Sequence, residues 1–137
     1  MKHSAEYYIE HLEMEPHVEG GYFKECLLEK EERNLWSSIY FMLAKGEVSH
    51  FHRLKSDEVW YYHDGNALTI YMIDEAGKLT AAKLGLDLEK GEVPQVLVPK
   101  GMIFGSAMEE EGFSLVGCMV SPCFKYEEFE LFDGRTT

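Results

Sequence analysis

The residues best suited to chemistry lie in one stretch, SHFHRLKSDEVWYYHDG, at positions 49–65. His50 and His52 are two residues apart, and side chains two apart on a strand point to the same face. If Glu58 lies on the antiparallel partner strand, its carboxylate faces both imidazoles. Two imidazoles and one carboxylate suit Fe, Mn, Ni or Zn and leave positions open for water or substrate. The pattern predicts a divalent metal centre, although histidines that merely alternate on a strand would give the same spacing.

Other residues in and beyond this stretch are candidates for ligand binding. The rings of Trp60 and Phe104 suit stacking on a base or a sugar, but such rings also fill small barrels simply for volume. Arg53 suits bidentate binding of a phosphate or carboxylate, or an ion pair with Asp57 or Glu58. Gln95 is a polar residue inside an apolar strand pattern.

Only the first segment, residues 1–16, predicts a helix. Ser4 is a suitable N-cap, and the apolar residues that follow it have helical spacing. Pro16 is expected to end the helix, because proline cannot continue the hydrogen-bond ladder.

The rest of the chain predicts short strands rich in β-branched and aromatic residues. About eight such runs recur at intervals of about 10 residues, separated by turn signals and without intervening helices. The clearest hairpin runs from LTIYMID through Ala76-Gly77 to LTAAKLG. This spacing is typical of an antiparallel sandwich or barrel, and the absence of a linker predicts a single domain over 1–137.

Composition limits the classes of function. Hydrophobic residues make up 45% of the 137, enough for a globular core, and the net charge of −12 disfavours nucleic-acid binding. The sequence shows no apolar run long enough to span a bilayer and no signal peptide, so we expect no membrane contact and a cytoplasmic location. Cys26, Cys118 and Cys123 are then expected to be buried free thiols.

Two motifs resemble those of the cupin superfamily. Gly46, His50-x-His52, Glu58 and Gly65 resemble the first cupin motif, and VPKGMIF, with its Pro99-x-Gly101, resembles the second. Nearly the whole chain is similar to the single-domain branch catalogued as domain of unknown function 985. The resemblance implies an antiparallel jelly-roll barrel with the site inside. It departs from metal-binding cupins at Phe104, where these usually carry a third histidine.

A second resemblance concerns residues 17–28. EGGYFKE is similar to the arm of cupin sugar-nucleotide epimerases, which crosses a dimer interface and helps to line the nucleotide pocket. The resemblance implies that His52 removes a proton beside a carbonyl and that Tyr62 or Tyr40 returns one. Phe23, Glu25 and Tyr40 would then contact the ligand, and no metal would be needed.

The sequence therefore predicts an all-β cupin that binds a small molecule, with a sugar or nucleotide sugar as the expected ligand class. Epimerase- or isomerase-like proton transfer is the favoured activity. A metal-dependent dioxygenase or decarboxylase and a non-catalytic binding module are the alternatives. The expected assembly is a homodimer that pairs through the arm at 17–28.

Overall fold

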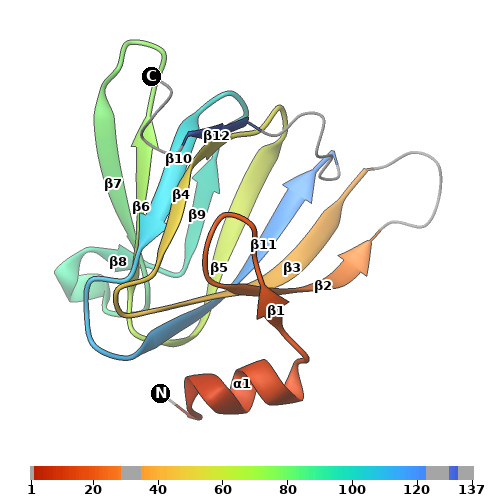
Figure 1. The fold of residues 1–137 in the computed structure, drawn as a ribbon. Coiled ribbons are helices and arrows are strands. Elements are labelled where there is room, and N and C mark those ends of the chain that lie inside the picture. Colours follow the sequence, from red (N-terminus) through yellow and green to blue (C-terminus); the bar gives the residue numbers. More distant parts are fainter. Residues whose placement is uncertain (1, 29–34, 123–129, 133–137) are drawn as a thin grey trace.

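The computed structural model describes residues 2–28, 35–122 and 130–132, which fold mainly into strands (Figure 1). Helix α1 (Ala5–His11) begins after Ser4, whose hydroxyl accepts the backbone N–H of Tyr7 at 3.1 Å, as the capping pattern predicted. The prediction that the helix continues to Pro16 is wrong. Glu13 takes a left-handed backbone conformation with φ of 54°, which turns the chain back.

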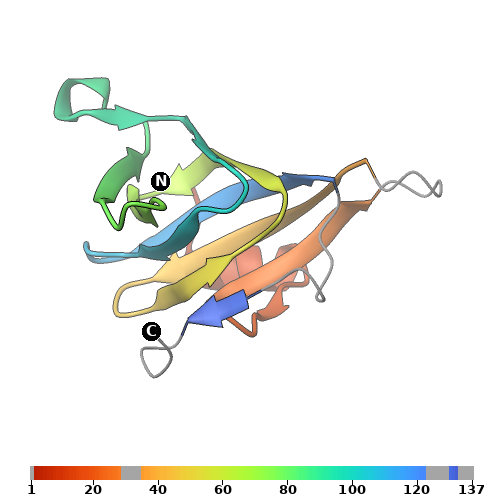
Figure 2. The same ribbon diagram turned by 90° about the horizontal axis from the view of Figure 1, so that it is seen from above.

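The strands form two six-stranded sheets. The first sheet has the order β1 (Glu15–Pro16), β2 (Tyr22–Leu28), β3 (Ser37–Ala44), β11 (Phe113–Ser121), β5 (Asp57–Gly65) and β9 (Gln95–Val98). The second has the order β12 (Glu130–Phe132), β4 (Val48–Arg53), β10 (Ile103–Ala107), β6 (Leu68–Ile73), β7 (Leu79–Leu84) and β8 (Glu92–Val93). The described pairings are antiparallel except β7 with β8. A 3₁₀ turn, η1 (Leu88–Lys90), leads into β8 and projects from the body of the molecule (Figure 2).

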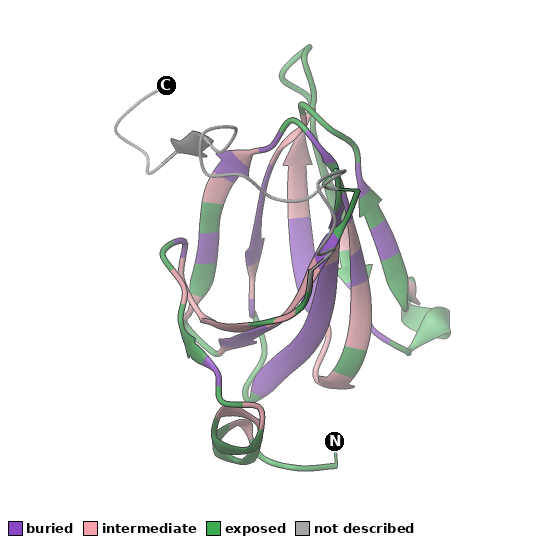
Figure 3. Ribbon diagram, turned by 90° about the vertical axis from the view of Figure 1, so that its right-hand side faces the viewer, coloured by how far each residue is buried: buried purple, intermediate pink, exposed green. Residues whose placement is uncertain are grey.

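The two sheets face each other and bury the main core between them (Figures 1 and 3). Fully buried side chains from both sheets meet there, among them Phe41 and Trp60 of the first sheet and Ile70 and Phe104 of the second. A second cluster lies on the outer side of the first sheet, where α1 packs against Met42, Phe113 and their neighbours.

This architecture confirms the predicted all-β antiparallel jelly-roll with a short N-terminal helix. The sheets pack as two layers and do not close into a continuous barrel. The predicted hairpin is also confirmed, because β6 and β7 pair antiparallel from Leu68↔Leu84 to Ile73↔Leu79.

The arm predicted at 17–28 contains a turn followed by β2, which pairs with β3 of the same chain. Within the described residues, β1 pairs only with Tyr22 and Phe23, at one end of the other edge of β2. Exchange of the arm between two chains stays a prediction.

Two of the three cysteines lie within the described residues. Both are free thiols, as expected. Cys118 is buried as predicted, whereas Cys26 is only half-buried; Cys123 lies outside the described residues. In the described part of the chain, no helix is long and apolar enough to cross a membrane.

Candidate functional site

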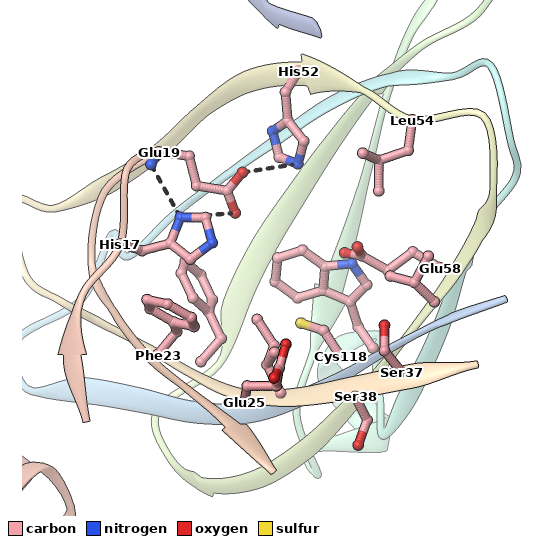
Figure 4. A pocket seen from close by; sticks show the side chains of 14 residues that line it. His17, Glu19, Phe23, Glu25, Ser37, Ser38, His52, Leu54, Glu58 and Cys118 are labelled. Carbon is pink, nitrogen blue, oxygen red and sulfur yellow. Dashed lines mark hydrogen bonds and ion pairs between the residues drawn. The ribbon is translucent and has the colours of Figure 1, made fainter. Parts of the chain in front are cut away.

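A cavity of about 110 Å³ lies inside the sandwich. Engineered cavities of about 150 Å³ admit benzene, so a space of this order takes a small organic molecule and not only water. Its walls come from the turn before β2, from β2, β3, β5 and β11, and from the end of β4 (Figure 4). The lining side chains are His17, Glu19, Phe23, Glu25, Ser37, Ser38, Ile39, Phe41, His52, Leu54, Glu58, Trp60, Cys118 and Val120.

Glu19 lies between two imidazoles in this cavity (Figure 4). Its Oε2 is 3.1 Å from Nε2 of His52, and its Oε1 is 3.8 Å from Nδ1 of His17. The Glu19 and His52 residues are 7% and 3% exposed. Nδ1 of His17 accepts the backbone N–H of Glu19 at 3.0 Å, so the ring proton of neutral His17 is on Nε2.

The contact between Glu19 and His52 must contain a proton. Nδ1 of His52 lies 2.7 Å from the carbonyl oxygen of His50, and because a carbonyl only accepts, Nδ1 carries a hydrogen. A neutral ring then has a lone pair on Nε2, and a carboxylate presents only lone pairs to it. Two acceptors would repel at 3.1 Å. One proton therefore lies between Oε2 and Nε2, either on the acid or on the imidazole.

Burial favours the uncharged form of this pair. It raises the pKa of Glu19 well above its usual range, helped by the nearby charge of Glu58 and opposed by the Ser49 hydroxyl. Burial also lowers the pKa of His52 to about 4, although the hydrogen bond to the His50 carbonyl acts in the opposite direction. The shared proton is thus placed mainly on Glu19, and His52 accepts it as a hydrogen bond.

A bulge in β4 separates the two histidines of the HxH pattern. Phe104 of β10 pairs with His52 and Ser106 with Ser49, so that two residues of β4, at 50 and 51, stand opposite Gly105 alone. An extra residue breaks the alternation of a strand. His52 and Ser49 are buried, whereas His50 is exposed and does not line the cavity. The expectation that His50 and His52 face the same ion is therefore wrong.

The bulge still places backbone groups of His50 in the site. Its N–H donates to the carbonyl of Glu19 at 2.9 Å, and its carbonyl accepts from Nδ1 of His52. Gly105 makes this possible, because a Cβ there would lie 2.8 Å from the Ser49 oxygen and 3.2 Å from the Phe51 nitrogen. The main chain of His50 thus holds both the Glu19 turn and the His52 imidazole in place.

Glu58 lies on another wall of the cavity, and its neighbour Asp57 points away from it. Asp57 is exposed and accepts the backbone N–H of Lys100 at 2.8 Å. Burial raises the pKa of Glu58 to about 8, against the opposing effect of the Trp60 indole N–H. The buried thiol of Cys118 also lines the cavity. Burial raises its pKa, and so do the charges of Glu58 and Glu19.

The residues present do not fit the predicted centre of His50, His52 and Glu58. His50 is turned outward, and both ring nitrogens of His52 already have partners. Phe104 packs against His52 with ring centroids 4.1 Å apart, where the resemblance places a third histidine. Among the described residues, no three His, Cys, Asp or Glu side chains converge as ligands for a metal ion.

The predicted ligand-binding residues divide into two groups. Phe23, Glu25 and Trp60 line the cavity together with His52. The remaining predicted residues do not line it: Tyr40, Arg53, Tyr62, Gln95 and Phe104.

Four of these five residues lie in surroundings that the structure describes. The Tyr62 hydroxyl donates to the Gly65 carbonyl. Tyr40 packs in the outer cluster under α1, and Gln95 is exposed on the edge strand β9. Phe104 is 1% exposed and forms the core behind His52.

His17 and Glu19 were not predicted as site residues; both lie in the segment 17–28, which is predicted as an arm. The turn that holds them depends on Gly20 and Gly21, with φ of 114° and 74°. This Gly-Gly pair was the available signal, because two successive glycines indicate a tight turn whose neighbours take fixed positions. Nothing in the local pattern shows that the turn packs against β4.

A family model described as "Cupin superfamily (DUF985)" matches residues 6–132. The chain belongs to this family. A solved structure of protein SO0799 from Shewanella oneidensis is 60% identical, with a TM-score of 0.91 over 95% of this chain and 85% of that one. A hypothetical protein from Leishmania major is 36% identical, with a TM-score of 0.88 over 95% of this chain and 88% of that one. The uncharacterized protein YML079W of Saccharomyces cerevisiae is 26% identical over 87% of this chain and 70% of its own length.

A more distant cupin has the same fold. Bacillus subtilis oxalate decarboxylase is 19% identical to this DUF985 chain, with a TM-score of 0.66 over 85% of this chain and 29% of that one. Mn(II) centres are attributed to that enzyme. At this identity the likeness shows the fold alone. The comparisons do not bear on the resemblance to sugar-nucleotide epimerases, which stays a prediction.

Proposed function

We propose that this cupin binds a small polar molecule of the sugar type in its cavity and moves a proton beside the carbonyl group of that molecule. The observation that carries the proposal is the buried contact of 3.1 Å between Glu19 Oε2 and His52 Nε2, which requires a shared proton. Proton transfer by a positioned acid–base pair needs such a pair within reach of a ligand, and both residues line the cavity.

The lining favours an uncharged polyhydroxy compound. Carboxyl, imidazole and serine groups offer hydrogen bonds, and the rings of Phe23, Phe41 and Trp60 offer apolar walls for the C–H face of a sugar. The lining residues that the structure describes include no Lys or Arg, so a diphosphate would find no counter-charge among them. Of the two predicted ligand classes, we therefore propose the sugar rather than the nucleotide sugar.

The reaction starts from the charge-separated form of the pair. In this form the shared proton is on Nε2 of His52. The C–H bond beside the carbonyl breaks, and its proton binds Oε1 of Glu19 while the proton on His52 stays in place. The electron pair of the C–H bond becomes part of an enolate. Return of the proton to the other face of the same carbon, after the enolate turns over in the cavity, gives an epimer. Return of the proton to the neighbouring carbon, with the hydroxyl proton of that carbon moving to the former carbonyl oxygen, gives an isomer with the same atoms.

The test follows deuterium uptake by NMR when the full-length protein is incubated in D₂O with dihydroxyacetone, fructose or glucose. We expect exchange at the carbon beside the carbonyl, reduced about 10²- to 10⁴-fold by His52→Gln or Glu19→Gln. The matched control is His63→Gln, because His63 is exposed and does not line the cavity.

Three results would contradict the proposal. Exchange in the wild type that is unchanged in His52→Gln would remove the pair from the reaction. Exchange abolished by EDTA would favour the metal-dependent alternative. Binding of the sugars without any exchange would leave the non-catalytic module.

A further inference from the structure

The indole N–H of Trp60 is a buried donor that points to a ligand. Trp60 lies on β5, is 1% exposed and lines the cavity. Its Nε1 has no hydrogen-bond partner among the residues that the structure describes. Buried N–H groups are rarely left unpaired, because they lose their hydrogen bond to water on folding. The unused donor therefore indicates that an acceptor atom occupies this part of the cavity when a ligand is bound.

Glu58 lies beside this donor. It is two residues before Trp60 on the same strand, and both side chains are buried on the same face. The indole N–H acts on Glu58 as a hydrogen-bond donor and lowers its pKa, so it lies close to the carboxyl. The two groups do not reach the geometry of a formed hydrogen bond, which leaves the donor free for a ligand oxygen beside Glu58. Cys118 pairs with Trp60 across the sheet, so its thiol closes the same wall.

We infer that the Trp60 N–H and the Glu58 carboxyl together form an oxygen-binding pocket that takes the carbonyl oxygen of the ligand. Figure 4 shows Glu58 across the cavity from the pair of Glu19 and His52. A carbonyl compound that spans the cavity has its oxygen at this pocket and its adjacent carbon near the acid–base pair. The role in catalysis rests on the proposed function, whereas binding of the oxygen does not.

The chemistry of the pocket suits an oxygen that gains negative charge. With its pKa raised to about 8 by burial, Glu58 is a neutral acid at pH 7 and donates an O–H. A carboxylic acid kept neutral in an apolar site is an established way to stabilise an enolate oxygen. Preorganised donors in a water-poor site are most effective where charge develops during the reaction.

The lining also contains features that would suit an organic cation. Glu19 and Glu58 lie close enough for their charges to interact, and aromatic rings complete the wall. An ammonium group, however, offers the Trp60 N–H no acceptor of its own and needs Glu58 to be ionised, whereas burial raises the pKa of Glu58 to about 8. These two observations favour a ligand oxygen, and the experiment includes the cation as an opposing result.

The test uses three probes of similar size on the full-length, ¹⁵N-labelled protein: cyclohexanone, methylenecyclohexane and cyclohexylammonium. The chain contains two tryptophans, so the spectrum of Trp36→Phe assigns the two indole signals. We expect cyclohexanone to move the Trp60 N–H proton signal downfield and methylenecyclohexane to leave it without a downfield shift. In Trp60→Phe, the affinity for cyclohexanone falls about tenfold, and that for methylenecyclohexane does not.

Equal shifts with cyclohexanone and methylenecyclohexane, or tighter binding of cyclohexylammonium than of cyclohexanone, would overturn the inference. The wild-type spectra decide this even if Trp60→Phe fails to fold. The two proposals also fail separately. If the protein shows the Trp60 shift with cyclohexanone but no deuterium exchange with the sugars, the reaction is refuted and the oxygen-binding pocket is kept. If it shows deuterium exchange but no Trp60 shift, only the pocket is refuted.

Discussion

Glu58→Gln is expected to stabilise the protein relative to wild type by about 3 kcal/mol more at about pH 9.5 than at about pH 5.5. Burial raises the pKa of Glu58 from 4.5 to about 8 in the folded chain. The folded state therefore holds a proton that the unfolded state has released. The contribution of that proton to stability is complete below pH 4.5 and is lost as the pH rises through about 8. Glutamine keeps the shape and cannot ionise.

The measurement is urea denaturation of both proteins at the two pH values, which avoid the sequence pI of about 4.9. The matched control is Glu25→Gln, which removes an exposed carboxylate from the same cavity. We expect its difference from wild type to stay constant within about 0.5 kcal/mol. A stability difference for Glu58→Gln that does not change with pH would show that Glu58 is not held in a dry environment.

Gly20→Ala is expected to destabilise the protein by about 3 kcal/mol or more and to abolish the proposed exchange activity. Gly20 has φ of 114°, and a Cβ there would lie 1.9 Å from the Val48 carbonyl oxygen. The turn cannot easily move away from Val48, because two backbone hydrogen bonds hold it. The carbonyl of Glu19 accepts the His50 N–H, and the Gly20 N–H donates to the His17 carbonyl. Any shift moves Glu19 away from His52.

The matched control is Gly77→Ala in the hairpin between β6 and β7. Gly77 has a similarly unusual φ of 81°, but a Cβ there would meet nothing within 4 Å. Gly77→Ala is therefore expected to lose about 1 kcal/mol of stability from the left-handed backbone alone, without a steric clash. Thermal unfolding and the deuterium assay measure both variants. Equal losses of stability would show that backbone strain, and not the contact with β4, fixes the turn.

Much of the fold was predictable because its determinants are local. The Ser4 cap and the hairpin of β6 and β7 both depend on residues close in sequence. The expected pairing of the His52 strand with the Glu58 strand is wrong, because β4 and β5 belong to different sheets. The two cupin-like motifs identified the family before any pairing was known, and the family match over residues 6–132 agrees with them. Periodicity and turn chemistry were sufficient here because each is a property of a short segment.

The site could be predicted only in part, because its decisive features depend on contacts between distant segments. HxH predicts two histidines on one face, but whether β4 is regular depends on its pairing with β10, where Gly105 allows the backbone to approach closely. His17 and Glu19 carry no local mark of function. They reach the cavity because their turn packs against β4.

The sequence by itself thus determined the class of the fold, the family and the strands that carry His52, Glu58 and Trp60. The tertiary structure decided which side chains and backbone groups contact these three residues. It turned His50 outward, used its backbone to hold His52, and brought Glu19 to within 3.1 Å of that ring. The physical reason is burial: only the packed sheets exclude enough water to keep two glutamic acids protonated beside a neutral imidazole.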